Sequence, residues 1–97
     1  MSQQEINKII IDYLMPYEPV KIGLFGSFAR QEETPESDID ILINIKKRIS
    51  LYDLVQIYQD LEDKLGRKVD ILTEHSIKNL RFKKRMEKDL KIIYENP

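Results

Sequence analysis

Residues 38–45, with the sequence DIDILINI, constrain the fold of this chain more than any other segment. Polar and apolar side chains alternate here with the period of two that is typical of a β-strand. One strand face carries Ile39, Ile41, Ile43 and Ile45, and the other carries Asp38, Asp40, Leu42 and Asn44. Because a strand must bury its apolar face against another element, the segment predicts a sheet flanked by helices.

The length of 97 residues predicts a single domain, residues 1–97, with room for one layer of sheet and a few helices. Charged residues make up 34% of the chain, which indicates a globular domain with a heavily charged exterior. The 16 basic and 17 acidic residues nearly cancel, so no overall field attracts nucleic acid or an anionic membrane. The absence of cysteine excludes disulfides, thiolate zinc sites and cysteine nucleophiles.

The chain start, MSQQEINK, lacks the basic and apolar segments of an export signal, and no apolar run reaches membrane-spanning length. We therefore expect a cytoplasmic protein without a membrane partner.

Capping and periodicity predict the elements of the first half. Ser2 and Glu5 form a capping box for a helix that ends near Met15. Residues 20–25 read as a short buried strand, and residues 27–30 as one helical turn. The polar residues 31–36 then predict a loop before the strand at 38–45.

The second half repeats this alternation of helix and strand. Ser50 can cap a helix that Gly66 closes, and residues 68–72 read as a third strand. Ser76 can cap a last helix with Ile77, Leu80, Phe82, Met86, Leu90 and Ile93 on its inner face. The pattern predicts an α/β fold, a small mixed sheet with flanking helices.

The carboxylates of the central strand indicate a metal site. Asp38 and Asp40 share one face and lie about 6.6 Å apart along a strand that rises ~3.3 Å per residue. Both can converge on two ions held ~3.5–4 Å apart, and hard oxygen ligands favour Mg²⁺ or Mn²⁺. If the third strand lies alongside, Asp70 becomes a metal ligand, a base for an incoming hydroxyl, or both.

The Gly26–Ser27 step supplies the other half of the predicted site. A glycine at a strand end lets the backbone approach a ligand, and a helix start presents free N–H groups to phosphate oxygens. The Ser27 hydroxyl can add a hydrogen bond. Because this turn follows strand 20–25 and the carboxylates begin strand 38–45, a shared site requires the two strands to be antiparallel. That layout suits phosphoryl or nucleotidyl transfer.

The segments GSFAR, residues 26–30, and SDIDIL, residues 37–42, together resemble the signature of the polymerase-beta-like nucleotidyltransferases. With Asp70 as third acid, the chain is similar to the minimal nucleotidyltransferases of the MNT or MntA type. The resemblance implies that Gly26 and Ser27 contact the phosphates of ATP. It also implies that Asp38 and Asp40 hold two Mg²⁺ ions, and that Asp70 joins one metal and activates the acceptor hydroxyl.

Three positions around the motif have open assignments. Arg30 either binds a phosphate or pairs with nearby surface glutamates, and Ser37 either contributes to the nucleotide site or orients the metal strand. Many relatives carry glycine where this chain has Gln31, which bears on the turn geometry.

The resemblance also implies a partner. Minimal nucleotidyltransferases are typically antitoxins of helical HEPN ribonuclease toxins, which they neutralise by transferring AMP from ATP to a tyrosine. We therefore expect a hetero-oligomer. One alternative is an antitoxin that neutralises by binding alone. A third hypothesis is a nucleic-acid binder that uses the cations Arg81, Lys84, Arg85 and Lys88 of the last helix.

Overall fold

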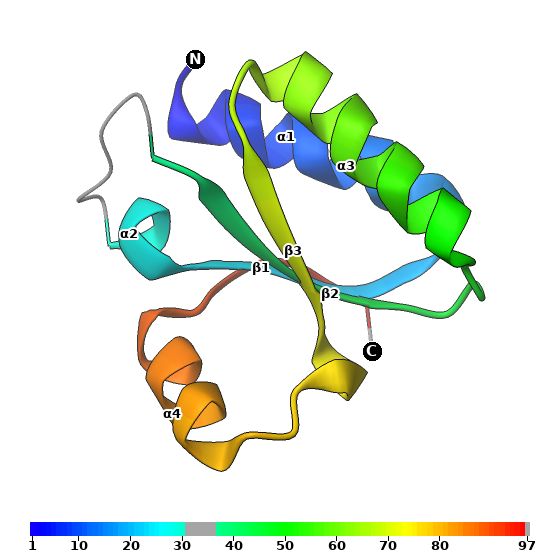
Figure 1. Cartoon of the computed structure of the whole chain (residues 1–97). Helices are drawn as coiled ribbons and strands as arrows, with labels where there is room; N and C mark the ends of the chain where they lie inside the picture. The colour runs from blue at the N-terminus through cyan, green and yellow to red at the C-terminus, as the bar shows by residue number, and fades with distance from the viewer. Residues whose placement is uncertain (31–36, 97) are drawn as a thin grey trace.

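Four strands form one mixed sheet in the order β3-β2-β1-β4 (Figure 1), as a computed structural model describes for residues 1–30 and 37–96. The strands are β1 Pro19–Phe25, β2 Ile39–Ile45, β3 Val69–Thr73 and β4 Lys91–Glu95. The helices are α1 Gln3–Leu14, α2 Gly26–Ala29, α3 Leu51–Leu65 and α4 Leu80–Asp89, with 3₁₀ turns η1 Met15–Tyr17 and η2 Glu74–Ser76. The predicted loop at 31–36 and Gln31 lie outside the described residues.

Local capping explains where the two long helices begin and end. Ser2 with Glu5, and Ser50 with Asp53, form reciprocal capping boxes at the starts of α1 and α3. At the end of α3, Gly66 adopts a left-handed conformation with φ +67°. These predicted helix boundaries are confirmed.

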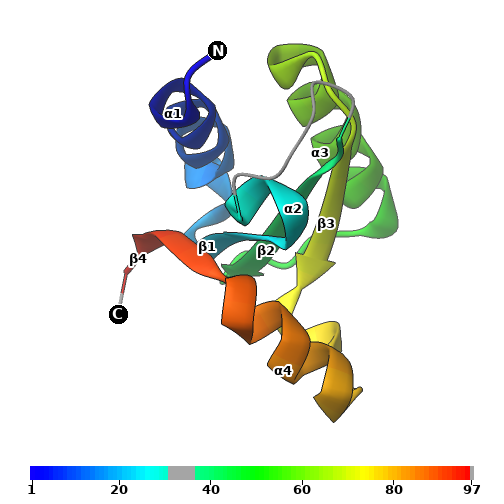
Figure 2. The same ribbon diagram turned by 90° about the vertical axis from the view of Figure 1, so that its left-hand side faces the viewer.

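The helices cover opposite faces of the sheet: α1 and α3 lie on one side and α4 on the other (Figures 1 and 2). The isoleucine face of β2 packs into the larger core beneath α1 and α3, where Ile10 and Leu61 are fully buried. On the opposite face, Leu42 forms a smaller core with Phe25 and Met86 of α4. Each face of β2 thus has the environment that its alternating pattern requires.

The prediction for the last helix was wrong in three respects. Asn79, not Ser76, caps α4, because its side chain accepts the N–H groups of Arg81 and Phe82. The predicted inward residues Leu80 and Phe82 are 73% and 42% exposed. No helix continues through Ile93, because residues 91–95 form β4.

A non-local requirement explains this strand. β4 pairs antiparallel with β1, whose outer edge would otherwise present unpaired backbone groups. Gly23 of β1 provides the room for the turn into β4: a Cβ there would lie 2.6 Å from Cδ1 of Leu90. The local pattern of a short apolar run such as KIIY fits either a helix or a strand. The unpaired edge of β1 therefore determines that this run forms a strand.

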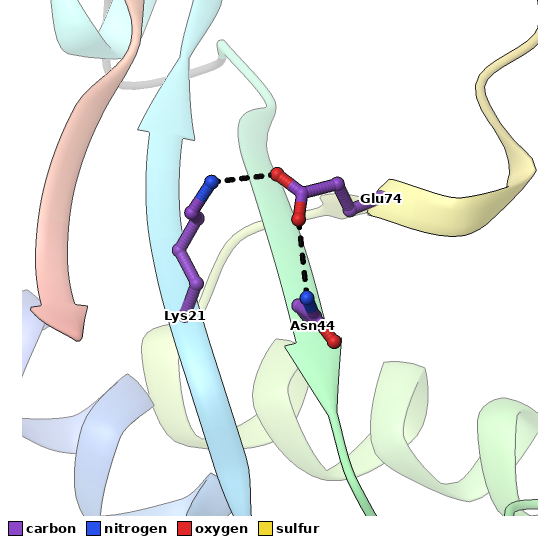
Figure 3. Close-up of polar contacts among 3 residues, drawn as sticks. All are labelled: Lys21, Asn44 and Glu74. Atoms are coloured by element: carbon purple, nitrogen blue, oxygen red, sulfur yellow. Dashed lines mark hydrogen bonds and ion pairs between the residues drawn. The ribbon is translucent and has the colours of Figure 1, made fainter. Parts of the chain in front are cut away.

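Lys21, Asn44 and Glu74 form a polar cluster between β1, β2 and η2 (Figure 3). Lys21 donates to Oε2 of Glu74 at 2.7 Å, and the Asn44 amide donates to Oε1 at 3.1 Å. The contacts tie η2 to β1 and β2, and the lysine hydrogen bond lowers the pKa of Glu74.

This group is expected to make folding stability depend on pH. Because the pKa of Glu74 is lower in the folded state, its stabilisation is present at neutral pH and is lost as the pH falls through the folded-state pKa. Urea unfolding at pH 7 and pH 3 should show that the wild type loses about 1 kcal/mol more than Glu74→Gln. Asp12→Asn, in the exposed Lys8–Asp12 pair, serves as the control and should shift little. Equal losses in the wild type and Glu74→Gln would contradict this role.

Within the described part of the chain, no helix combines the length and apolar character needed to cross a membrane.

Candidate active site

The sheet brings the predicted carboxylates together at the end where β1 finishes and β2 and β3 begin. β1 and β2 are antiparallel, with Phe25 opposite Asp40, which confirms the orientation that the shared site required. β2 and β3 are parallel, and Asp40 lies directly opposite Asp70. Asp38 is exposed and immediately precedes β2. Asp40 and Asp70 lie on the α4-side face, because each is two residues from a leucine of that face.

The turn after β1 touches this carboxylate group directly. Gly26 has φ +74°, and a Cβ placed there would overlap the Oδ2 atom of Asp40 and lie 3.2 Å from its Cγ. Only glycine combines this backbone conformation with the missing side-chain atom. The predicted meeting of a Gly-Ser turn with the Asp-x-Asp strand is therefore present, and Ser27 follows Gly26 in α2.

Negative charge dominates the electrostatics of the site. Burial raises the pKa of Asp40, and the negative charges of Asp70 and Asp38 raise it further, while Arg30 partly offsets them. Three carboxylates without competing imidazole or thiolate ligands match the hard oxygen donors that Mg²⁺ or Mn²⁺ prefers. Among residues 1–30 and 37–96, no group of three or more such side chains lies close enough together to hold a metal ion in this conformation. Asp38, Asp40 and Asp70 are the residues that would hold a divalent cation, because carboxylate oxygens are its preferred ligands.

Arg30 and Ser37 have contacts that the sequence did not indicate. Nη1 of Arg30 lies 2.6 Å from Oδ2 of Asp89, which links α2 to the end of α4. The carbonyl of Ser37 accepts hydrogen bonds from the guanidinium of Arg67. The surface glutamates considered as partners of Arg30 lie outside the described residues.

Two α3 side chains complete the outer edge of β3. The hydroxyl of Tyr58 accepts the N–H of Ile71 at 3.0 Å, lies 3.2 Å from the Ile71 carbonyl, and is 3.5 Å from Oδ1 of Asp70. Glu62 accepts the N–H of Val69 at 3.0 Å. The helical spacing of Leu54, Tyr58 and Leu61 by itself favours a packing role for Tyr58. Tyr58 and Glu62 lie four residues apart at the border of the apolar stripe of α3. This spacing is the signal that could have indicated that both bind the β3 backbone.

Tyr58→Phe is expected to destabilise the edge that carries Asp70. The substitution keeps the ring but leaves the Ile71 N–H and carbonyl without their partner, at a cost of about 1–2 kcal/mol in the free energy of unfolding. Urea unfolding and amide hydrogen exchange at Ile71 would measure the change. Tyr52→Phe is the matched control, because Tyr52 lies on the same helix and is 88% exposed. If both variants behave alike, the edge bonds carry no stability.

Comparison with known families decides the class of this site. The family model described as polymerase beta, nucleotidyltransferase, matches residues 7–97. The chain belongs to the polymerase-beta-like nucleotidyltransferases. The predicted enzyme class, a nucleotidyltransferase, is therefore confirmed. In this chain the Gly-Ser turn and the Asp-x-Asp strand meet.

Curated relatives of this nucleotidyltransferase indicate which type within the family it resembles. Two candidate protein adenylyltransferases of Methanocaldococcus jannaschii are each 47% identical to it over 74 residues, which is 76% of this chain and 76% of theirs. The protein adenylyltransferase MntA of Thermococcus cleftensis is 37% identical over 59 residues, 61% of this chain and 60% of that protein. The minimal type of nucleotidyltransferase is thus the group to which the chain is similar.

Solved structures confirm the predicted fold. A candidate minimal nucleotidyltransferase matches with a TM-score of 0.76 and 25% identity, over 91% of this chain and 89% of that one. A chain from a toxin–antitoxin complex with AMP-PNP gives a TM-score of 0.80 at 22% identity, over 93% and 73% of the two chains. A tri-AMPylated Shewanella oneidensis HEPN toxin in complex with MNT antitoxin supplies another match, with a TM-score of 0.77 and 22% identity over 98% and 74%.

Proposed function

We propose that this nucleotidyltransferase transfers AMP from ATP to a tyrosine hydroxyl of a partner HEPN toxin, with Mg²⁺ as cofactor, and so acts as the antitoxin of the pair. The observation that carries the proposal is the contact of the Gly26 turn with Asp40, opposite Asp70 in the neighbouring strand. This arrangement supplies a phosphate-binding turn and acidic groups in one place. The names of the relatives, protein adenylyltransferases and MntA, support protein as the acceptor.

The turn is the nucleotide side of the proposed site. The positive φ of Gly26 brings the backbone against the carboxylates, so phosphates bound by Ser27 lie beside Asp38 and Asp40. Arg30 adds a positive charge at the end of that short helix, and Ser37 stands next to Asp38 immediately before β2. A triphosphate seated here has its reacting phosphorus next to the acidic group.

The three aspartates would hold the Mg²⁺ ions, two in the proposed mechanism, and Mn²⁺ has the same ligand preference. Bound Mg²⁺ supplies Lewis-acid stabilisation of the charge on the α-phosphate and the departing pyrophosphate. Asp70 is exposed at the sheet edge, where an incoming hydroxyl can reach it, and it accepts the tyrosine proton. The tyrosine oxygen bonds to the α-phosphorus as the bond to the pyrophosphate oxygen breaks.

The partner assignment rests on the structural neighbours. Chains from the MntA–HepT and MNT–HEPN complexes match the fold of this chain. We extend this to a hetero-oligomer with a HEPN toxin in the cytoplasm, where ATP is available. The near balance of positive and negative charges gives nucleic acid no overall attraction as the acceptor.

Label transfer tests the function. The protein is incubated with ATP labelled on the α-phosphate, Mg²⁺ and a candidate HEPN toxin, and the toxin is then analysed for a modified tyrosine. We expect label on the toxin that requires Mg²⁺, and neutralisation at substoichiometric amounts of the nucleotidyltransferase. A stable complex without label, with neutralisation only at equal stoichiometry, would overturn the proposal in favour of an antitoxin that acts by binding alone.

A further inference from the structure

We infer that Arg67 is a positioning residue of the active site, which holds Asp38 and the nucleotide-binding turn in their working places. The inference rests on the proposed function, because it concerns how precisely the carboxylates and the turn are placed for that reaction. Arg67 lies between Gly66, which ends α3, and the start of β3, outside the motifs that identify the family.

The guanidinium of Arg67 anchors the peptide immediately before Asp38. Its Nε and Nη2 atoms donate to the Ser37 carbonyl at 3.2 and 2.7 Å. Two donors that converge on one oxygen restrict the orientation of that carbonyl more than a single hydrogen bond does. The adjacent residues continue this connection, because the N–H of Ile39 donates to the Lys68 carbonyl at 3.0 Å.

Asp38 needs such an anchor more than Asp40 does. Asp40 has a partner on each side in the sheet, Phe25 of β1 and Asp70 of β3. The strand pairing of β2 with β3 begins at Ile39, so Asp38 precedes the described ladder. The orientation of Asp38 therefore depends on the peptides next to it, and Arg67 binds the first of these.

The same guanidinium also contacts the nucleotide side of the site. It lies over the ring of Phe28, 5.4 Å from the centroid, and Phe28 is only 2% exposed. Phe28 follows Ser27 in α2, so the Arg67 guanidinium over this ring supports the helix that carries the turn. Arg67 thus joins three segments that each carry a part of the site: α2, the peptide before β2, and the beginning of β3.

Arg67→Lys is the appropriate test, because lysine keeps the charge but lacks the planar group that makes both contacts. Arg48→Lys is the matched control, since Arg48 is an exposed arginine between β2 and α3. For Arg67→Lys we expect kcat for AMP transfer to fall about 10- to 100-fold, while KM for ATP changes by less than about threefold. The Kd for Mn²⁺, measured without nucleotide, should rise about tenfold, because the substitution would leave a metal-binding carboxylate less well oriented. The control should match the wild type in all three quantities.

Two further readouts separate positioning from general stability. Amide exchange at Ile39 should accelerate in Arg67→Lys, while exchange at Ile22 and Leu24 in β1 stays unchanged. Free guanidinium ion at millimolar concentration should restore part of the kcat of Arg67→Ala, since it can occupy the same place against Phe28 and the Ser37 carbonyl. Unchanged kcat, Mn²⁺ affinity and Ile39 exchange in Arg67→Lys would overturn the inference.

A rise in KM for ATP with kcat preserved would also overturn it, because Arg67 would then act as a nucleotide ligand. The proposed function fails by a different result. If the wild type transfers no label to any acceptor, the proposed AMP transfer is refuted. The Mn²⁺ affinity and the Ile39 amide exchange of Arg67→Lys would still show whether Arg67 positions the carboxylates.

Discussion

Replacing Asp38 and Asp40 together by asparagine is expected to abolish both AMP transfer and toxin neutralisation. Asparagine preserves the shape of each side chain but removes the charges that would hold Mg²⁺. Transfer of α-phosphate label should fall at least about 10³-fold, as for the removal of a central catalytic group. Growth of cells that produce the toxin should be arrested in the presence of the variant as it is in the absence of antitoxin.

This result must be separated from unfolding, and the structure indicates how. Burial and the neighbouring carboxylates raise the pKa of Asp40, so its charged form destabilises the metal-free fold at neutral pH. Asp40→Asn should therefore be at least as stable as the wild type in urea at pH 7 with a chelator present. Asp63→Asn, on the exposed surface of α3, is the control that should leave transfer intact. Retained neutralisation by the double variant would exclude catalysis as the mechanism of the antitoxin.

Gly26→Ala is expected to be the most damaging substitution of a single glycine in this chain. Its φ of +74° strains any L-residue, and the new Cβ would overlap the Asp40 carboxylate. We expect a loss of about 2–3 kcal/mol in the free energy of unfolding and at least a 100-fold loss of transfer. Urea unfolding and label transfer would measure the two effects.

Gly66→Ala separates backbone strain from the contact with the carboxylate. Gly66 has a similar φ of +67°, but in the described part of the chain no neighbouring group lies within 4 Å of its added Cβ. This variant should lose about 1 kcal/mol from strain alone and keep its transfer activity. The difference between the two alanine variants reports the contact between the turn and Asp40. Equal effects on transfer would show that this contact has no part in the site.

Short-range patterns were sufficient for most of the elements. Capping residues within three positions of each other placed the starts of α1 and α3, and the alternation in residues 38–45 placed β2. The exception is the C-terminal segment, where β4 replaced a predicted continuation of the helix. A short apolar run is compatible with both structures, and the unpaired edge of β1 lies about 70 residues away in sequence.

The candidate site likewise combines residues that the local sequence indicates with an arrangement that only the strand pairings determine. The residues proposed for the site, Gly26, Ser27 and the three aspartates, were chosen from the sequence by their chemistry and spacing. That they share one end of the sheet depends on two strand pairings, the antiparallel β1–β2 and the parallel β2–β3. Periodicity states which face a side chain occupies, but it does not state which strand lies beside it.

What the sequence by itself determined is the local chemistry: capped helices, strands with one apolar face, a glycine turn and an acidic strand typical of nucleotidyltransferases. Only the tertiary structure decided which groups support that chemistry. Arg67 meets the Ser37 carbonyl across 30 residues, and Arg30 meets Asp89 across 59. The physical reason is that hydrogen bonds between distant segments leave no periodic trace along the chain, because each partner is chosen by the packing of whole elements.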